Sequence, residues 1–536
     1  MAIHKENIID IPKGTFIHKR NNNEYVYVYT KFYRNNDGKS RNKSLCIGKK
    51  IDATSKMYPN DNYFLHFKIE KEYNDEVKKI GFVSVVDKCF NEIGLKDILA
   101  SCFGDDRTNL IKIISSYLIQ GGESMSYVDH FTEEHCFFTD SCLLSSQRVS
   151  ELFESIMNTG LTDFFKEWIK KTTENQYIYY DVTSVSTYSD WIDHAEYGYN
   201  RDGEELKQIN IGLFTAENSK LPVYYENYNG SLTDKSNVIN VVKNAKYKGL
   251  NNVKLVLDGG FFDRKRILEL YNSGLIFTIG MPGKLKESKK IISENKSDLY
   301  SIQYSTTYQN TFGKLIDYEL FGIKGKIFVG LDTKSRNLKL DDINRKIAQY
   351  KYELENTKSN YDTIIKQKKY KSLFKITKEE NSKGFSFELD ENKVEEASSY
   401  YGYFLVFTTD MNATATDIIY HYREKDADEK MFYALKNYDD LDRLRTHKQK
   451  TTDGKLFVSF IALILRSWLN QKVCEYKKRK HLTLTNIINK LSDIQILHTK
   501  AETRYIKNVT KEQNEILECF GLNETIIDDI IKTYNL

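Results

Sequence analysis

The sequence has little proline and cysteine for its length. It holds 4 Pro and 7 Cys among 536 residues, and an odd, scattered set of cysteines excludes a disulfide framework and is typical of reduced thiols. Long apolar runs are also missing, because the longest, 456–465, stops at Arg466 and is shorter than the roughly 20 residues that span a bilayer. We therefore expect a buried helix there and no membrane segment. Residues 1–6 lead to no apolar stretch, so we expect no secretory signal and a cytoplasmic protein.

A large excess of charge is absent as well. The formal net charge is +4, so binding to nucleic acid would have to depend on local basic patches. Hydrophobic residues make up 40% and aromatic residues 13% of the chain, which excludes wholesale disorder. A chain of 536 residues is too long for one ordinary core, and we expect two to four domains.

A zinc site is not expected. The one cluster of possible ligands comprises His130, His135, Cys136 and Cys142. The adjacent His135 and Cys136 are poorly placed to bind one tetrahedral ion, and no Cys-x2-Cys pair accompanies them.

Residues 25–47 have the pattern of a β-hairpin. Aromatic and β-branched residues run up to Tyr33, Asp37-Gly38 marks a turn, and residues 44–47 return. Such a ribbon could lie along DNA, but lysines on strand edges also protect soluble proteins from aggregation, and the sequence leaves both explanations open. The basic residues of the hairpin and its end are Lys31, Arg34, Lys39, Arg41, Lys43, Lys49 and Lys50.

The middle of the chain changes from a helical to a mixed pattern. Residues 81–160 place apolar side chains at helical spacing. The next segment predicts the order β-β-β-α-β-α-β, in which Asp181 lies at the end of the first strand and Asp258 directly after the fourth. The predicted elements are strands at 176–183, 208–214, 221–225, 252–257 and 275–280 and helices at 237–246 and 263–271.

A second acidic region lies far downstream, in a predicted helix over 421–436. At about 100° per residue, Tyr422, Lys425, Glu429 and Lys436 fall on one stripe about 60° wide. The stripe combines a carboxylate able to hold a metal with cations and a hydroxyl able to hold phosphates. A solvated helix face with charges at i,i+4 and i,i+7 is the alternative.

The long separation between Asp258 and Glu429 predicts an inserted domain, because structureless loops of such length are rare. We expect strands near its start and end, at 299–303, 327–331 and 385–389. Apolar residues spaced 4 and 3 apart over 343–364 predict one long helix, which could pair within the insertion or across a dimer. A strand at 403–409 then leads to the helix with Glu429.

The spacing Tyr422-x2-Lys425-x3-Glu429-x6-Lys436 resembles the Y-x2-R/K-x3-E-x6-K signature of DDE transposases, in the branch named after insertion sequence four. The order of elements around the two aspartates resembles a ribonuclease-H-like core. The resemblance implies an α/β multidomain protein, in which this core is interrupted by a mostly β insertion with a long helix. A small β-hairpin and a helical DNA-binding region would precede the core.

The implied activity is metal-dependent DNA cleavage and strand transfer of an insertion element. Asp181, Asp258 and Glu429 would be the catalytic acids and would hold two Mg²⁺ ions, which Mn²⁺ can replace. Tyr422, Lys425 and Lys436 would contact DNA phosphates. Lys425 stands where the family more often has Arg, and Gly259 replaces the polar residue often found after the second aspartate.

Other acids compete for these roles. Asp263 competes with Asp258, although it lies inside or at the cap of the following helix. Asp426 competes with Glu429, at about 60° from it around the helix. Two other functions also stay open: a catalytically silent, transposase-derived DNA-binding regulator, and a non-transposing nuclease on the same core.

The implied partner is double-stranded DNA, both the terminal inverted repeats of the element and the target, bound by a homodimer. Basic residues in 441–450 and 477–481 are candidates for contact with it. The resemblance places the protein in the bacterial cytoplasm, associated with the nucleoid when bound to DNA. The expected domains are a β-rich arm at 1–75, a helical DNA-binding domain at 76–172, core parts at 173–285 and 401–470, an inserted β domain at 286–400 and a helical region at 471–536.

Overall fold

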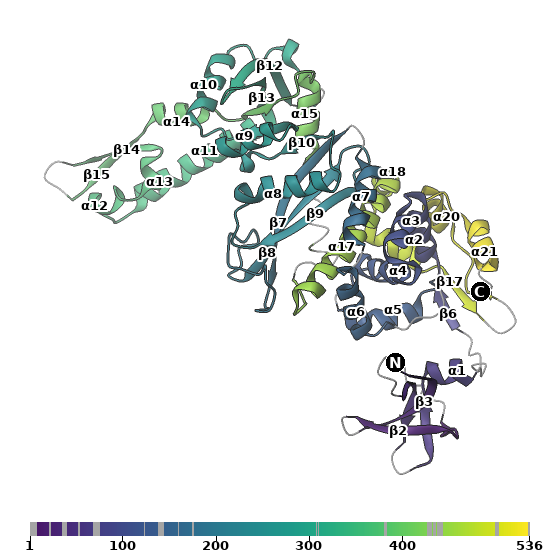
Figure 1. Ribbon diagram of the computed structural model, residues 1–536. Helices are drawn as coiled ribbons and strands as arrows, with labels where there is room; N and C mark the ends of the chain where they lie inside the picture. The colour runs from purple at the N-terminus through teal and green to yellow at the C-terminus, as the bar shows by residue number, and fades with distance from the viewer. Residues whose placement is uncertain are drawn as a thin grey trace. The chain divides into compact units, whose positions relative to one another are not determined.

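The chain divides into two compact units, which we describe separately. Unit 1 comprises residues 1–160, 438–440 and 450–536, and unit 2 comprises residues 161–437 and 441–449. Unit 1 is built from segments that are far apart in the sequence (Figure 1). The computed structural model describes residues 8–20, 23–34, 40–51, 54–67, 76–122, 124–137, 144–158, 160–173, 176–306, 308, 310–379, 383–425, 431–432, 436, 443–498 and 503–533.

The N-terminal part of unit 1 is a five-stranded antiparallel sheet with the strand order β1-β5-β4-β3-β2. The predicted hairpin is confirmed, because β3 and β4 pair along most of their length. Val26, Val28, Ile47 and Met57 form a small core on one face. The elements are β1 (Ile9–Asp10), β2 (Thr15–Arg20), β3 (Asn23–Arg34), β4 (Ser40–Lys50), β5 (Lys56–Pro59) and α1 (Asp61–Phe67).

Helices make up most of the rest of unit 1, as the apolar spacing over 81–160 predicts. The N-terminal group comprises α2 (Gly81–Glu92), α3 (Leu95–Phe103), α4 (Asp105–Ile119), α5 (Val128–Glu134) and α6 (Ser146–Ile156). The C-terminal group comprises α17 (Gln449–Lys472), α18 (Cys474–Lys480), α19 (Leu484–Ser492), α20 (Lys511–Cys519) and α21 (Glu524–Thr533). A small sheet joins the two groups, since β17 (Gln495–His498) pairs with both β6 (Glu76–Lys79) and β18 (Thr503–Tyr505).

Helix α17 contains the longest apolar run and is the buried helix that the sequence predicts. Phe457 contacts Phe103 with ring centroids 5.4 Å apart, and Arg466 donates a hydrogen bond to the Ile119 carbonyl at 3.0 Å. Within the described residues, no single helix has the length and apolarity of a membrane span. The pair α17 and α18, bent by 59°, reaches that threshold together on length and composition alone.

Unit 2 is organised around one eight-stranded mixed sheet with the order β12-β13-β16-β11-β10-β7-β8-β9. The predicted order β-β-β-α-β-α-β is confirmed between residues 177 and 281. These elements are β7 (Tyr177–Thr187), β8 (Lys207–Ala216), β9 (Pro222–Asn229), α8 (Asp234–Tyr247), β10 (Lys254–Leu257), α9 (Arg264–Asn272) and β11 (Ile276–Met281).

The centre of this sheet is parallel and buried on both faces. β10 runs parallel to both β7 and β11, while β8 is antiparallel to β7. The side chains of β7 are buried along the strand except at Asp181, which accords with its nearly continuous run of aromatic and β-branched residues. Helix α7 (Leu161–Thr172) covers β9, with the Trp168 indole N–H donating to the Pro222 carbonyl at 2.9 Å.

Part of the segment expected as an inserted domain, 286–400, belongs to the central sheet. Strands β12 (Thr311–Leu320) and β13 (Ile323–Asp332) belong to the central sheet, because β13 pairs with β16 (Tyr403–Thr408). Residues 299–303, which we expected to form a strand, are a turn and the start of a 3-10 helix, η3 (Ile302–Tyr304). Residues 327–331 form a strand as predicted, but Ile327, Phe328 and Val329 are fully buried in the central sheet.

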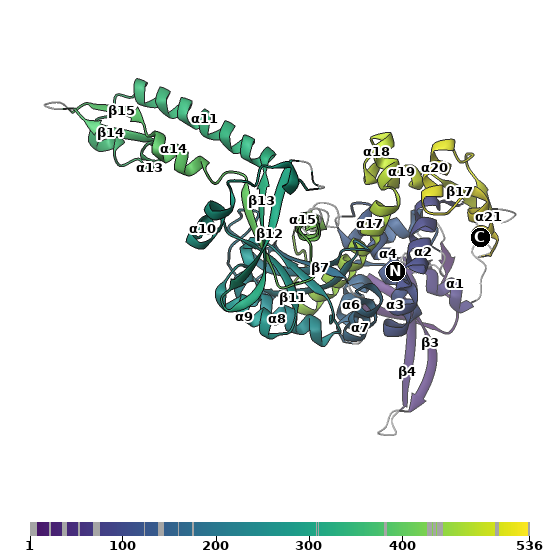
Figure 2. The same ribbon diagram turned by 90° about the horizontal axis from the view of Figure 1, so that it is seen from above.

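A smaller arm, residues 333–402, connects the neighbouring strands β13 and β16 (Figure 2). Its two ends meet, since the Asp332 amide donates to the Gly402 carbonyl at 2.8 Å. The arm contains α11 (Thr333–Asn356), α12 (Tyr361–Ile364), α13 (Lys368–Lys371), β14 (Phe374–Lys378), β15 (Phe385–Leu389) and α14 (Glu391–Ser398), and α10 (Lys286–Asn295) precedes β12.

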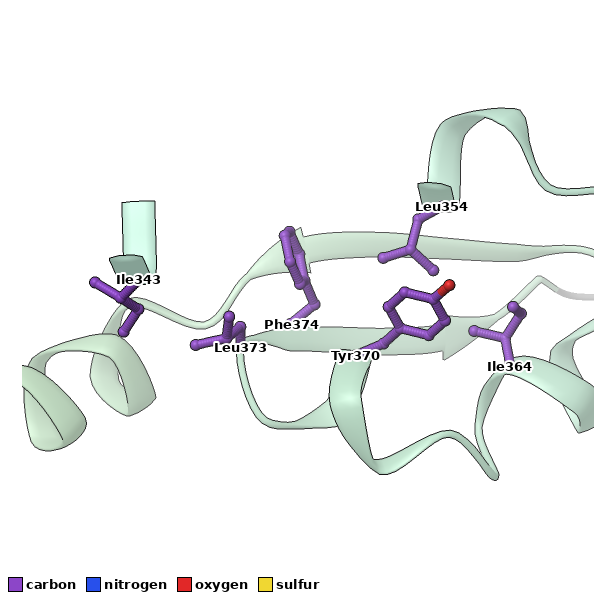
Figure 3. Close-up of a cluster of buried hydrophobic side chains, with 6 residues drawn as sticks. All are labelled: Ile343, Leu354, Ile364, Tyr370, Leu373 and Phe374. Atoms are coloured by element: carbon purple, nitrogen blue, oxygen red, sulfur yellow. The ribbon is translucent and has the colours of Figure 1, made fainter. Parts of the chain in front are cut away.

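The apolar stripe predicted over 343–364 is covered within the arm. A cluster of buried side chains joins α11 to α12, α13 and β14 (Figure 3). The expected single helix is wrong at its C-terminal end: α11 stops at Asn356, and the Asn360 side chain accepts the Thr363 amide to cap α12. Asn favours caps over helix interiors, so the apolar spacing continues across a helix break. The cluster comprises Ile343, Leu354, Ile364, Tyr370, Leu373 and Phe374.

The helix predicted at 421–436 begins earlier than expected. Helix α15 (Ala415–Glu424) starts at a capping box formed by Thr414 and Asp417, and its described part ends at Glu424, with Lys425 as the C-cap. Met431, Phe432 and Lys436 also have helical conformation. Residues 426–430, including Asp426 and Glu429, lie outside the described residues.

Candidate active site

Asp181 and Asp258 come from neighbouring parallel strands. Tyr180 of β7 is the register partner of Leu257 of β10, so the two aspartates are the next residues along paired strands about 4.8 Å apart. Their charges interact, because ionised Asp258 raises the pKa of Asp181. The structure therefore brings together two of the three acids that the sequence selected.

The Asp181 carboxyl is largely buried. Burial raises its pKa to about 6 and Asp258 adds to this rise, while the Val182 amide and two nearby cations oppose it. The Val182 amide donates to Oδ1 at 2.8 Å, and Arg201 Nη1 lies 4.0 Å from the same oxygen. The side chain keeps 27% of its surface exposed, so a ligand can still reach it.

Asp258 follows β10 and caps the short 3-10 helix η2 (Gly259–Phe261) through its own side chain. The Gly260 amide donates to Oδ2 at 3.4 Å, and Lys425 Nζ lies 3.0 Å from Oδ1. Burial favours the neutral acid, yet the nearby Lys425 charge and the hydrogen bonds from Lys425 and the backbone outweigh it and lower the pKa of Asp258. Asp258 is thus a carboxylate at neutral pH beside a second carboxyl that ionises less easily.

Tyr422 reaches the same carboxylate from α15. Its hydroxyl donates to Asp258 Oδ1 at 3.4 Å, and burial together with the Asp258 charge raises the pKa of Tyr422 to about 12. Lys425 Nζ also lies 5.3 Å from the centre of the Tyr422 ring. A glycine makes this approach possible, because a Cβ at Gly280 of β11 would lie 2.2 Å from the Tyr422 hydroxyl.

Lys436 pairs with a different acid. Its ammonium pairs with Asp202 at 2.6 Å, in the connection between β7 and β8 that also supplies Arg201. Sequence reasoning missed Arg201, the cation beside Asp181. Its surroundings, Asn200-Arg201-Asp202-Gly203, carry only a turn signal, which gives no indication of a contact with a strand 20 residues earlier.

Asp263, the competitor of Asp258, has a structural role. Its side chain accepts the Arg266 amide at 3.2 Å and caps α9. This leaves Asp258 as the acid beside Asp181. Among the described residues no group of three or more His, Cys, Asp or Glu is arranged to hold a metal ion, and Glu429 lies outside them.

A second polar network under α15 was not anticipated. His421 Nδ1 contacts Glu217 Oε1, which also accepts the Tyr179 hydroxyl at 3.2 Å. His421 stacks on Tyr177 with ring centroids 3.5 Å apart, and Tyr177 donates to Asp410 Oδ2 at 2.9 Å. Glu217 is only 7% exposed. No spacing in the sequence links these residues, because they come from four separate elements.

This network fixes the last turn of α15. Four consecutive residues each contact a different residue of unit 2. His421 contacts Glu217, Tyr422 contacts Asp258, Arg423 pairs with Asp332 at 2.8 Å, and Glu424 pairs with Lys220 at 2.6 Å. The position of Tyr422 and Lys425 beside Asp258 therefore depends on contacts on every side of the helix.

Residues of two other candidate groups have partners within unit 1. In the basic run 477–481, Lys478 pairs with Glu475 at 2.8 Å, and Lys480 pairs with Glu515 at 3.2 Å. In the His/Cys cluster, His135 Nδ1 bonds the Phe131 carbonyl at 2.9 Å, and burial lowers the pKa of this histidine to about 4. Cys142 lies outside the described residues.

No protein-family model matches the sequence, and no curated protein matches it. The fold is similar to a solved structure described as "Cryo-EM structure of piggyBac transposase synaptic complex with hairpin DNA (SNHP)". That likeness has a TM-score of 0.37 and 10% sequence identity, and covers 84% of this chain and 82% of that chain. An overlap at that TM-score is too loose to carry an assignment of fold or function.

Proposed function

We propose that this chain is a DDE-type transposase that cleaves DNA and joins the freed end to a target in a metal-dependent reaction. The observation that supports the proposal most is the pair of carboxyls at Asp181 and Asp258 on neighbouring parallel strands, with Tyr422 and Lys425 of the helical segment beside them. Glu429 follows Lys425 by four residues in the sequence and completes the proposed triad.

The donor set suits a hard divalent cation. Two carboxylates on adjacent strands repel one another, and a cation bound between them would relieve the unfavourable burial that raises the pKa of Asp181. In the proposal Asp181, Asp258 and Glu429 hold Mg²⁺ or Mn²⁺. Such ions would supply charge stabilisation to the oxygens at a phosphorus centre that undergoes in-line displacement.

The other residues of the site act on the DNA backbone. Lys425 and Tyr422 both reach Asp258 Oδ1, so a cation at Asp258 would compete with Lys425 and free its ammonium for a phosphate. Gly259 and Gly260 place backbone without side chains directly after Asp258, which leaves room for a phosphate to approach. Arg201, beside Asp181, offers a second cation from the connection between β7 and β8.

The test is a strand-transfer assay on the DNA that flanks this reading frame. A fragment with a pre-cut 3′-hydroxyl end is incubated with the protein, Mg²⁺ and a supercoiled target. We expect joined products with the natural chain and a loss of about 100-fold or more with Asp181→Asn or Glu429→Gln. Asp263→Asn is the matched control, because this acid caps a helix nearby and should leave joining unchanged.

The outcomes separate the competing functions. Cleavage without joined product would indicate a nuclease on the same core. Binding of the fragment without cleavage would indicate a silent regulator. Joining that persists in Glu429→Gln would remove this residue from the mechanism.

A further inference from the structure

The positive charge of the chain is concentrated in the N-terminal sheet. Residues 8–67 contain 11 Lys and Arg against 5 Asp and Glu, whereas the rest of the chain contains 68 against 70. The N-terminal sheet therefore carries all of the net positive charge. Such a local concentration is the electrostatic signature of a surface for a polyanion.

The charge lies on a part of the hairpin that projects from the sheet. Strand β2 pairs with residues 23–28 of β3, and β5 pairs with residues 48–50 of β4. Beyond these points β3 and β4 pair with each other, residues 29–34 with residues 40–44 (Figure 2). We call these two segments the projecting ribbon.

The projecting ribbon is exposed, basic and aromatic. Lys31, Arg34, Arg41 and Lys43 are all exposed, and Lys31 and Lys43 are register partners across the two strands. Like charges placed opposite each other are unfavourable unless a counter-charge is supplied. Among the described residues no acid forms an ion pair with these four side chains.

Aromatic residues accompany these cations. Phe32 is 72% exposed, and its ring lies 5.4 Å from that of Tyr29, which in turn stacks on Phe16 at 4.4 Å. A register shift between Tyr29 and Lys31 re-aims the side chains beyond it, and Thr30 donates to the Lys43 carbonyl at 3.2 Å. Lysines that only protect a strand edge from aggregation need no exposed Phe beside them, because an exposed aromatic ring favours the aggregation that such lysines prevent.

We propose that the projecting ribbon binds double-stranded DNA by entering its major groove. A two-stranded antiparallel ribbon matches that groove, which is about 12 Å wide. Lys31, Arg34, Arg41 and Lys43 contact the phosphates on its walls, and Phe32 covers apolar base or sugar surface. The inference rests on the proposed function only in requiring that the chain acts on DNA, and it places duplex recognition on a surface distinct from the acids.

The test measures binding of the full chain to a 30-base-pair duplex by fluorescence anisotropy, with a chelator present so that no cleavage occurs. The variant Lys31→Gln/Arg34→Gln/Arg41→Gln/Lys43→Gln should bind at least about 10-fold more weakly at moderate salt. The slope of log K against log salt should become shallower by about 3.6, since each of the four phosphate contacts contributes about 0.9. Lys31→Arg/Lys43→Arg should bind like the natural chain, which shows that charge and not the loss of a fold is responsible.

A matched control removes four exposed cations from the arm, as Lys339→Gln/Arg345→Gln/Lys351→Gln/Lys358→Gln. An equal loss of affinity in this control would overturn the proposal, as would an unchanged salt slope in the ribbon variant. Tighter binding to a single strand of the same sequence than to the duplex would also overturn it. A chain that binds duplex through the ribbon but never cleaves or joins DNA would instead contradict the proposed function and leave this inference intact.

Discussion

At the scale of residues, the site consists of two carboxyls kept in different states by different neighbours. Asp258 has an ammonium at 3.0 Å, whereas the closest cation to Asp181 in the described structure is Arg201 at 4.0 Å. Asp181 and Asp258 could be predicted because an acid within or directly after a run of buried-strand residues stands out in the sequence, although Asp181 lies in the middle of β7 and not at a strand end as expected. Arg201 and Glu217 could not, since their roles arise only when connections fold back onto the strands.

The raised pKa of Asp181 makes a prediction about stability. Burial raises this pKa from 3.8 to about 6, so between these values the unfolded chain loses its proton first and folding becomes less favourable as pH rises. Replacing Asp181→Asn should therefore stabilise the metal-free protein at pH 7, by roughly 1–3 kcal/mol. At pH 4 the folded natural chain holds a neutral Asp181, and the gain should vanish.

Thermal unfolding in a chelator at the two pH values measures this difference. Asp263→Asn serves as the control, because an Asn caps a helix about as well as an Asp does. An Asp181→Asn variant whose melting temperature differs from that of the natural chain by the same amount at both pH values would contradict the assignment of the shift to this carboxyl.

At the scale of elements, the central strands were predictable and the helix boundaries were not. Buried strands such as β7 and β10 appear in the sequence as short runs of aromatic and β-branched residues between turns. The predicted helix extends beyond the end of α11, because the apolar spacing continues past Asn356 into α12. The predicted start of helix α15 was too late. The Thr414–Asp417 capping box marks the N-terminus of the helix, whereas the prediction relied on the stripe of charged residues further along.

Helix α15 also supports a prediction about coupling. The buried Glu217 carboxyl is held by His421 and Tyr179, so His421→Ala should leave a poorly compensated charge and destabilise the protein by roughly 1.5–3 kcal/mol. Glu217→Ala/His421→Ala should cost less than the sum of the single changes, by about 1 kcal/mol or more. Cleavage should fall in both single variants, because Tyr422 and Lys425 lose their support.

Urea denaturation of the four chains gives the coupling energy. Glu424→Gln is the comparison on the same turn: its pair with Lys220 is about one-third exposed, and its loss should cost less than about 1 kcal/mol. Additive effects of the Glu217 and His421 changes would show that the two side chains do not act as a pair.

At the scale of the whole molecule, the sequence predicts least well which distant segments of the chain fold together. The distance between Asp258 and Glu429 predicts an insertion, but only the pairing of β13 with β16 shows that β13 belongs to the central sheet and that residues 333–402 form an arm. The assembly of unit 1 from both ends of the chain left no trace in local patterns, since β6 and β17 are each four residues long. Such pairings are set by burial of whole segments, which short windows of sequence do not report.

The central claim is that three acids distant in sequence share one metal site, and iron-directed cleavage of the backbone tests it most directly. Fe²⁺ replaces Mg²⁺ at oxygen sites and, with ascorbate and peroxide, cuts the chain where it is bound. We predict cuts near residues 181, 258 and 429 together, suppressed by excess Mg²⁺ and lost in Asp181→Asn. Cuts near residues 181 and 258 with none near 429, or cuts unaffected by Asp181→Asn, would contradict the account.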